Sequence, residues 1–145
     1  MEISVNNIQS HLDVVQEIIA NNGYEQIETL ASKCFDVLSS GGCIFWMGNG
    51  GSAADSQHLA AELVGRFKLE RGPLRSIALT TDTSALTCIA NDYSYEDVFA
   101  RQVQALCRKG DMVIGISTSG TSRNITKALA SAREIGAITS MWTGQ

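Results

Sequence analysis

Four short apolar runs recur along this chain, and polar turns or stretches with helical periodicity separate them. The runs are CIFWM (43–47), SIALTT (76–81), DMVIGIS (111–117) and AITSMW (137–142). CIFWM is apolar throughout, which is typical of a strand buried on both faces of a sheet. Because strands of this kind alternate with helical segments, the sequence predicts an α/β fold with a parallel, doubly wound sheet.

The spacing of apolar residues between and before these runs predicts the helices. Two helices, near 4–21 and 24–39, precede the first strand. Further helices are expected near 53–67, 84–90, 96–108 and 123–135. The 96–108 segment begins with acidic residues and ends with Arg108, Lys109 and Gly110, an order that favours the helix dipole and a glycine cap.

Length and composition are those of one globular domain. The chain has 145 residues, 44% of them hydrophobic and 18% charged, so we expect a single domain over 1–145 with helices over 1–40 and the sheet core over 41–145. A net charge of −4 argues against a general nucleic-acid surface, and no run suits a membrane span or signal peptide. Four cysteines without metal-type spacing indicate reduced, mostly buried thiols in a cytoplasmic protein.

Two polar turns follow strands and lead into helices. GNGGS (48–52) offers close backbone approach, exposed amides and the Ser52 hydroxyl, and STSGTS (117–122) offers several hydroxyls. Ligands of parallel sheets bind beyond the carboxyl ends of the strands, and helix N-termini favour anions. Neither turn contains a lysine, so together they predict a neutral cradle for a phosphate monoester. The alternative is that the Ser and Thr residues are only N-caps.

A dinucleotide site is a second alternative, because Gly48, Gly50 and Ala53 match GxGxxA. That fingerprint also requires an acidic residue about 20 positions on, at the end of the second strand. The acid at that strand's end is Asp82, more than thirty positions after the glycines, and two helices precede the first strand. The dinucleotide interpretation is therefore disfavoured.

Two residue pairs add chemistry near these turns. His58 and Glu62 are four residues apart and lie on one face of a predicted helix. Glu62 is a candidate general base, and His58 and Glu62 together are candidates for two ligands of a metal ion. The alternative is a surface pair. Asn91 and Asp92 end the short helix after the second strand and are candidates for binding sugar hydroxyls, or simply terminate that helix.

Three blocks together resemble the phosphoheptose isomerase family of sugar-isomerase (SIS) domain enzymes. They are GNGGSAADSQHLAAEL, LTTDTSALTCIANDY and GDMVIGISTSGTSRNITKAL, in this order. The resemblance implies a flavodoxin-like three-layer sandwich. It also implies isomerisation of sedoheptulose 7-phosphate to D-glycero-D-manno-heptose 7-phosphate through an enediol, the first step of ADP-heptose synthesis for the lipopolysaccharide core.

The resemblance also assigns roles to individual residues. It implies a homotetramer with active sites at subunit interfaces and zinc as the metal. His58 and Glu62 match two zinc ligands, and Glu62 also matches a catalytic acid/base, two roles that compete. The residues that match substrate-binding positions, Glu62 among them, are Asn49, Gly50, Gly51, Ser52, Asn91, Asp92, Ser117, Thr118, Ser119 and Ser122.

The chain departs from the family pattern at its C-terminus. Family members continue past the fourth strand into a further strand and a helix that carries a glutamine and a histidine of the site. This sequence stops at Gln145, and its other histidine, His11, lies in the first predicted helix. The expectation is that 145 residues alone have little isomerase activity and hold zinc poorly.

Two non-catalytic functions remain as alternatives. A SIS-domain paralogue that resembles these isomerases binds the bacterial replication initiator, and a third possibility is a module that binds phosphosugars without turnover. The paralogue lacks the glutamate that stands here as Glu62. The presence of Glu62 therefore favours the enzyme.

Overall fold

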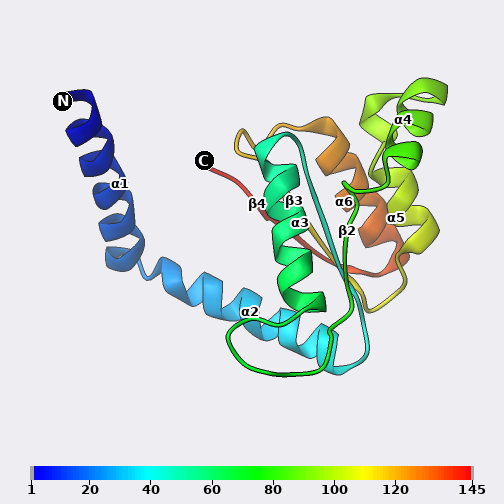
Figure 1. Ribbon diagram of the computed structural model, residues 1–145, viewed down its shortest axis with the longest axis horizontal. Coiled ribbons are helices and arrows are strands. Elements are labelled where there is room, and N and C mark those ends of the chain that lie inside the picture. Colours follow the sequence, from blue (N-terminus) through cyan, green and yellow to red (C-terminus); the bar gives the residue numbers. More distant parts are fainter. Residues whose placement is uncertain (1, 145) are drawn as a thin grey trace. The chain divides into compact units, whose positions relative to one another are not determined.

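A computed structural model describes residues 2–144, with side chains described from Ser4 to Gly144. Helices and strands alternate after two N-terminal helices (Figure 1). None of the helices within the described residues is long and apolar enough to cross a membrane. The elements are α1 (Glu2–Ala20), α2 (Gly23–Ser39), β1 (Ile44–Gly48), α3 (Gly51–Val64), β2 (Ser76–Ala78), α4 (Thr83–Asp92), the 3₁₀ turn η1 (Tyr95–Asp97), α5 (Ala100–Leu106), β3 (Met112–Ile116), α6 (Arg123–Ile135) and β4 (Ile138–Trp142).

The chain divides into two compact units, Met1–Asp36 and Val37–Gln145. The first unit contains α1 and most of α2, and the second contains the whole sheet with α3 to α6. The candidate site lies in the second unit. That residues 1–145 act as one domain stays a prediction.

The sheet has four parallel strands in the order β2-β1-β3-β4. All five residues of β1 and the first four of β3 are buried, as their apolar sequences predict. The order places β1 and β3 side by side although more than sixty residues separate them, with Gly48 paired to Ile116 at the carboxyl end. The prediction of a parallel, doubly wound sheet is confirmed.

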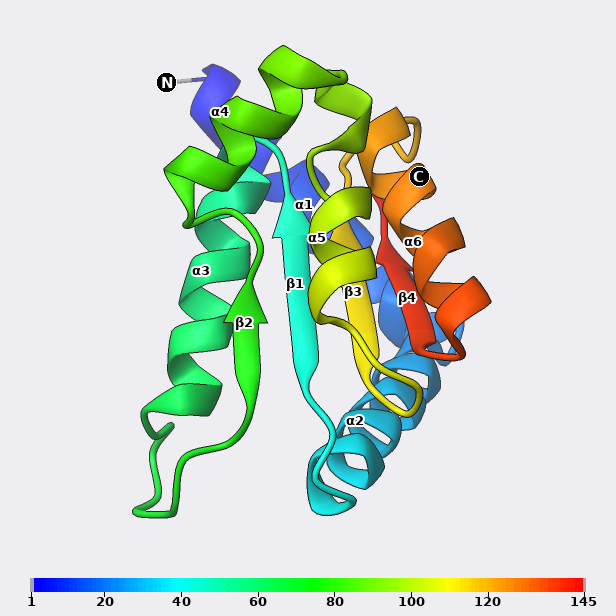
Figure 2. The ribbon, with the colours of Figure 1, turned by 90° about the vertical axis from the view of Figure 1, so that its right-hand side faces the viewer.

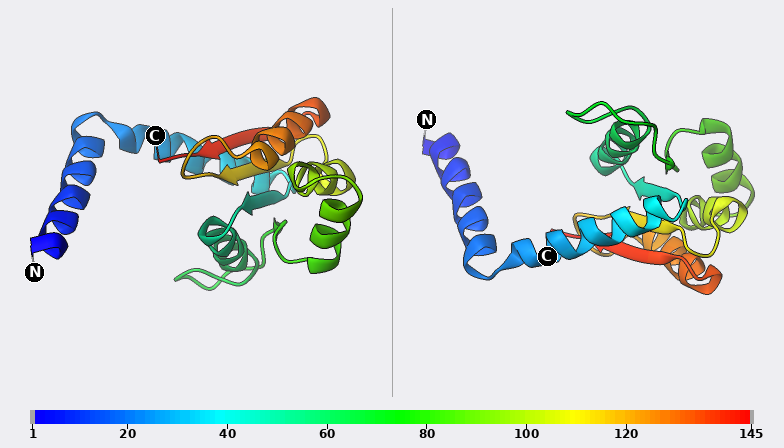
Figure 3. Two further views of the ribbon diagram at one scale, coloured as in Figure 1. Left: turned by 90° about the horizontal axis from the view of Figure 1, so that it is seen from above. Right: turned by 90° about the horizontal axis from the view of Figure 1, so that it is seen from below.

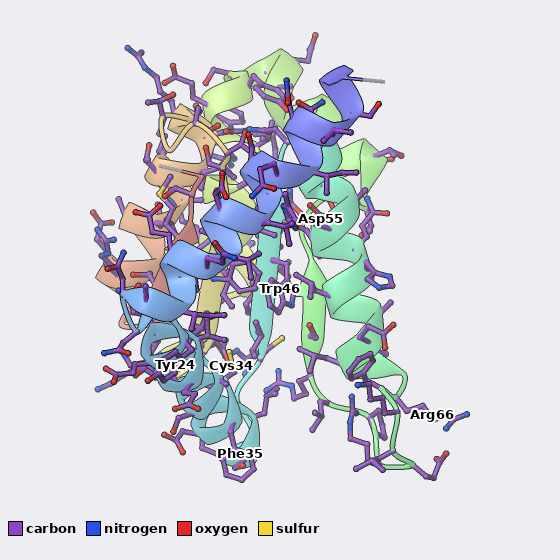
Figure 4. The ribbon with its side chains drawn as sticks, turned by 90° about the vertical axis from the view of Figure 1, so that its left-hand side faces the viewer. Tyr24, Cys34, Phe35, Trp46, Asp55 and Arg66 are labelled. Atoms are coloured by element: carbon purple, nitrogen blue, oxygen red, sulfur yellow. The ribbon has the colours of Figure 1, made fainter. Side chains whose placement is uncertain are left out.

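Helices cover both faces of the sheet. Figures 2 and 3 show α3 on one face and α5 with α6 on the other. The main core lies under α5 and α6, where Phe45 and Met47 of β1 meet Val103, Ile125 and other buried residues. On the opposite face Trp46 points from β1 toward the side that α3 covers (Figure 4), and its indole N–H donates to Ser76 Oγ at 2.9 Å.

The prediction of a single helix over 96–108 is wrong. Glu96 and Asp97 lie in the turn η1, and α5 begins only at Ala100 and ends at Leu106. Both acids bind α6 instead, Asp97 through Lys127 at 2.6 Å and Glu96 through Arg123 at 3.2 Å.

The prediction that Gly110 caps that helix is also wrong. Cys107 is already extended, and the buried carboxylate of Asp111 accepts the N–H of Arg108 at 2.8 Å, which turns the chain into β3. The same carboxylate accepts the N–H of Cys43 at 2.8 Å. Tertiary hydrogen bonds therefore end α5 before its sequence signals do.

At Gly115, α6 packs directly against β3. A Cβ at this position would collide with Cγ2 of the fully buried Ile125 and lie 3.3 Å from Met47 Cε. We expect Gly115→Ala to lower the free energy of unfolding by about 1–3 kcal/mol, the usual cost of overpacking a core. Urea unfolding followed by circular dichroism measures it.

Gly72→Ala is the matched control, because Gly72 is exposed and its Cβ would meet nothing within 4 Å. Equal midpoints for Gly115→Ala and the control would show that α6 does not pack on β3 as described.

Candidate functional site

The turn after β1 depends on two glycines. A Cβ on Gly48 would lie 2.5 Å from the Ser52 carbonyl oxygen, so only glycine allows the helix to start this close to the strand. Gly50 has φ 56°, a left-handed conformation that glycine adopts without strain. The helical hydrogen bonds begin with Ser52 N donating to Asn49 O at 3.0 Å and Ala53 N donating to Gly50 O at 3.1 Å. The N–H groups of Gly50 and Gly51 therefore precede this ladder, as expected at a helix N-terminus.

The turn after β3 gathers hydroxyl groups. Ser117 is buried, and its Oγ donates to Ser122 Oγ at 2.9 Å. Ser119 and Thr121 share a hydrogen bond between hydroxyls at 3.0 Å, and Thr118 is exposed. The turn is closed by Gly120 N donating to Ser117 O at 3.0 Å. One loop thus presents several hydroxyls at the start of α6.

These hydroxyls do not cap the helices. Ser122 occupies the N-cap position of α6 but makes no capping hydrogen bond with its side chain, and the N-cap of α3 is Gly50. By contrast, Asp82 caps α4, its carboxylate accepting the N–H of Ala85 at 2.9 Å. The alternative that Ser and Thr serve here only as N-caps therefore does not describe Ser122, and Asp82 has a structural role of its own.

A pair of hydrogen-bonded amides connects the first turn to the helix that follows the second: Asn49 is half-buried and Asn124, in α6, is buried. Asn124 Nδ2 donates to Asn49 Oδ1 at 2.8 Å, and Asn49 Nδ2 donates to Asn124 Oδ1 at 3.0 Å. Tyr95 in η1 donates its hydroxyl to the same Asn49 Oδ1 at 2.9 Å. Three segments that are distant in sequence are thus joined at the carboxyl edge of the sheet.

Asn91 and Asp92 lie in the last turn of α4, four and three residues before Tyr95. Both are exposed, and Asn91 Nδ2 donates to Asp92 Oδ1 at 2.9 Å. This hydrogen bond, and a second from the Cys88 thiol at 3.3 Å, hold the pKa of Asp92 below its usual value. Asp92 is therefore a carboxylate that can accept hydrogen bonds from sugar hydroxyls at neutral pH.

His58 and Glu62 lie farther along α3. His58 Nε2 is 3.7 Å from Glu62 Oε1, and the exposed fractions of their side chains are 75% and 34%. Glu62 is eleven residues after Gly51, roughly 16 Å along the helix. Arg71 donates to the backbone oxygen of Glu62 at 2.7 Å. Within the described residues no hydrogen bond or ion pair joins either side chain to the two turns.

His58 and Glu62 do not make a zinc site by themselves. Zinc in proteins takes four ligands, at least three of them from protein in most catalytic sites. Among the side chains that the structure describes, from Ser4 to Gly144, no group of three or more His, Cys, Asp or Glu could hold a metal ion. The described residues therefore bring together at most two such donors, too few for a zinc site.

Sequence reasoning missed Asn124 and Tyr95. Asn124 occupies a buried position at the start of the helix face that continues with Ala128 and Ala132. A polar residue at the first position of an apolar stripe was the available signal, because a buried amide needs partners. Tyr95 is 61% exposed, and nothing in its spacing indicates its contact with Asn49.

The cysteines are only partly as expected. None of the four forms a disulfide, but Cys88 is exposed and Cys34 is half-buried, while Cys43 and Cys107 are buried. Burial raises the pKa of Cys43 and of Cys107 to about 11. These two thiols are therefore unreactive core residues.

Comparison with known proteins identifies close relatives. The family model of the SIS domain matches residues 8–144. A phosphoheptose isomerase of Geotalea daltonii is 53% identical over 91% of this chain and 70% of its own length. One of Aquifex aeolicus is 54% identical over 83% of this chain. The chain spans 63% of the Aquifex relative's length.

Solved structures agree with this result. The structure of phosphoheptose isomerase from Neisseria gonorrhoeae has a TM-score of 0.74 and 41% identity, covering 89% of this chain and 74% of its own. That of a phosphoheptose isomerase from Francisella tularensis has a TM-score of 0.72 and 31% identity, covering 91% of this chain and 74% of its own. At these identities the likeness extends to sequence as well as fold.

The Cys88 thiol is a reporter for Asp92. Its pKa is raised, first by the hydrogen bond to Asp92 and then by the charge of that carboxylate. Because the thiolate is the reactive form, we expect Asp92→Asn to lower the pKa of Cys88 and to speed its alkylation by iodoacetamide at pH 8. Mass spectrometry of the labelled peptide measures the rate.

Asp82→Asn is the matched control, since Asp82 contacts the other end of α4. Equal labelling rates at Cys88 in the wild type and Asp92→Asn would contradict the hydrogen bond between Cys88 and Asp92.

Proposed function

The chain belongs to the SIS-domain family and, within it, to the phosphoheptose isomerases, and we propose that it isomerises sedoheptulose 7-phosphate to D-glycero-D-manno-heptose 7-phosphate. The observation that carries this proposal is the pair of turns at the carboxyl ends of β1 and β3, joined by the amides of Asn49 and Asn124. The family supplies the substrate, and the geometry of the turns supports a phosphate ester.

The phosphate binds at STSGTS (117–122). The hydroxyls of Ser117, Ser119 and Ser122 and the exposed Thr118 surround the N-terminus of α6, where the helix dipole favours an anion. The Ser117 hydroxyl donates a hydrogen bond to Ser122 Oγ. The hydroxyl hydrogen of Ser122 is then available for a hydrogen bond to a phosphate oxygen.

The sugar binds between the other segments. Gly50, Gly51 and Ser52 offer backbone N–H groups and a hydroxyl at the start of α3. Asn91 and Asp92 offer an amide and an ionised carboxylate that can form hydrogen bonds with the hydroxyls of the sugar. Together these groups orient an extended polyol whose phosphate is anchored at α6.

Glu62 is the proposed base. Its carboxylate takes a proton from carbon 1 of the ketose while the carbonyl oxygen at carbon 2 gains a proton, which gives a 1,2-enediol. Return of a proton to carbon 2 and loss of the proton from the oxygen on carbon 1 then give the aldose. A positioned acid/base of this kind contributes about 10²–10⁴-fold to a rate.

The protein acts as a homotetramer with its sites at subunit interfaces, as the family resemblance implies. Large apolar side chains exposed on the N-terminal helices support association: Val5, Ile8, Leu12, Val15, Ile18, Ile19, Ile27 and Phe35. A neighbouring subunit would also offer groups to Glu62, which lies roughly 16 Å along α3 from Gly51.

Zinc, a cytoplasmic location and a place in lipopolysaccharide heptose synthesis are further parts of the proposal. For zinc, His58 and Glu62 would be two ligands, and the remainder must come from outside the described residues. Metal analysis of the purified protein tests this part. Stoichiometric zinc that is unchanged by His58→Ala would refute the assignment of that ligand.

Glu62→Gln tests the proposed base. The amide keeps the size of the side chain but takes up no proton, so we expect kcat to fall by about 10²–10⁴-fold with little change in substrate binding. Activity is measured on the 145-residue chain and on the same chain extended at its C-terminus with the corresponding segment of the Geotalea daltonii relative.

Glu70→Gln is the control, because Glu70 is an exposed glutamate after the end of α3 that pairs with Arg66 at 3.5 Å. Full turnover in Glu62→Gln would exclude Glu62 as the base. Binding of sedoheptulose 7-phosphate without turnover in the extended wild type would favour a phosphosugar-binding module instead.

A further inference from the structure

Asn124 is the most fully bonded buried amide of the site. It is 3% exposed at the start of α6. Its Oδ1 accepts from Asn49 Nδ2 and from the N–H of Ile125, both at 3.0 Å, and its Nδ2 donates to Asn49 Oδ1 at 2.8 Å. A buried amide with so many hydrogen bonds has one strongly preferred orientation.

The amide pair connects parts of the chain that the sheet does not hold together. The ladder between β1 and β3 ends at the pair Gly48 and Ile116, so no strand pairing joins the two turns beyond it to each other. The turn that contains Asn49 is rich in glycine, which favours mobility unless another contact restrains it. The reciprocal hydrogen bonds of Asn124 provide that restraint, and Tyr95 adds a third bond to Asn49.

We propose that Asn124 is a positioning residue that acts through Asn49, fixing the GNGGS turn relative to the phosphate-binding loop that precedes α6. The catalytic part of this inference rests on the proposed function. Asn124 need not touch the substrate, since its amide oxygen and one amide hydrogen already bind protein groups. Its effect is to keep the N–H groups of Gly50 and Gly51 at a set distance from the phosphate.

If the role of Asn124 were purely structural, its replacement would have a different effect. If Asn124 only stabilised α6 through Ile125, its replacement would lower stability without changing the affinity for substrate. If it acts through Asn49, its replacement changes the Michaelis constant, and the effect disappears when Asn49 is already absent. A double-mutant cycle distinguishes these cases.

The kinetic experiment compares Asn124→Ala, Asn49→Ala and the double variant with sedoheptulose 7-phosphate as substrate, in the chain form that turns it over. We expect each single variant to lower kcat/KM by roughly tenfold to a hundredfold, mainly through KM, because a misplaced binding group is costly. The double variant should match Asn49→Ala within about twofold. Multiplicative effects of the two single variants would overturn the inference, as would an unchanged KM in Asn124→Ala.

Ser131→Ala is the control for a lost buried hydrogen bond on the same helix. Ser131 is buried in α6 and its Oγ accepts from Gln104 Nε2 at 3.3 Å, away from both turns. We expect this variant to lower stability without changing KM. An equal rise of KM in Ser131→Ala would mean that general loosening of α6, and not the contact with Asn49, explains the effect.

Hydrogen exchange tests the positioning role without any substrate. In Asn124→Ala we expect faster amide exchange over 49–53 while β1 and the rest of α6 remain protected. Tyr95→Phe removes one bond from an exposed side chain, so it should fold normally and give a smaller change in the same direction. Unchanged exchange over 49–53 in both variants would overturn the inference.

The two experiments separate the inference from the function. A wild type that neither binds nor converts sedoheptulose 7-phosphate would remove the proposed function and the catalytic part of the inference. The exchange result would still decide whether Asn124 positions the turn.

Discussion

The parallel pairing of β1 with β3 is the constraint on which the site depends. It brings Gly48 and Ile116 to the same edge of the sheet, so the two polar turns begin side by side although they are far apart in sequence. Burial of both strands fixes their register, because a shift by one residue would move their apolar side chains to the wrong face. The location of the candidate site is thus a consequence of the core.

Close packing then brings each helix start to the strand that precedes it. Gly48 lets the chain approach Ser52, and Gly115 lets α6 lie against β3 at Ile125. The hydroxyls of the second turn bind one another in place of capping α6, and the helix N-terminus remains available for an anion. The chemistry of this edge follows from small residues in the strands and polar residues in the turns.

Much of this arrangement could be predicted from local sequence signals. Apolar runs locate the four strands, and the stretch 123–135 gives the bounds of α6 because its polar turn and its terminal glycine are both clear. The prediction of one helix over 96–108 was wrong for two reasons. Its acidic residues bind Lys127 and Arg123 on another helix, and Asp111 ends α5 early. Such tertiary contacts leave no periodic pattern in the sequence. The two turns could be predicted because their composition is a local signal. The contact of Asn124 with Asn49 is tertiary, so it could not.

In the proposed site both turns bind one phosphosugar. A titration of the ¹⁵N-labelled protein with sedoheptulose 7-phosphate, followed by two-dimensional NMR, tests it most directly. We expect saturable shifts of the amides of Gly50, Gly51 and residues 117–122 with a single dissociation constant. Saturable shifts that leave both turns unchanged would contradict the account.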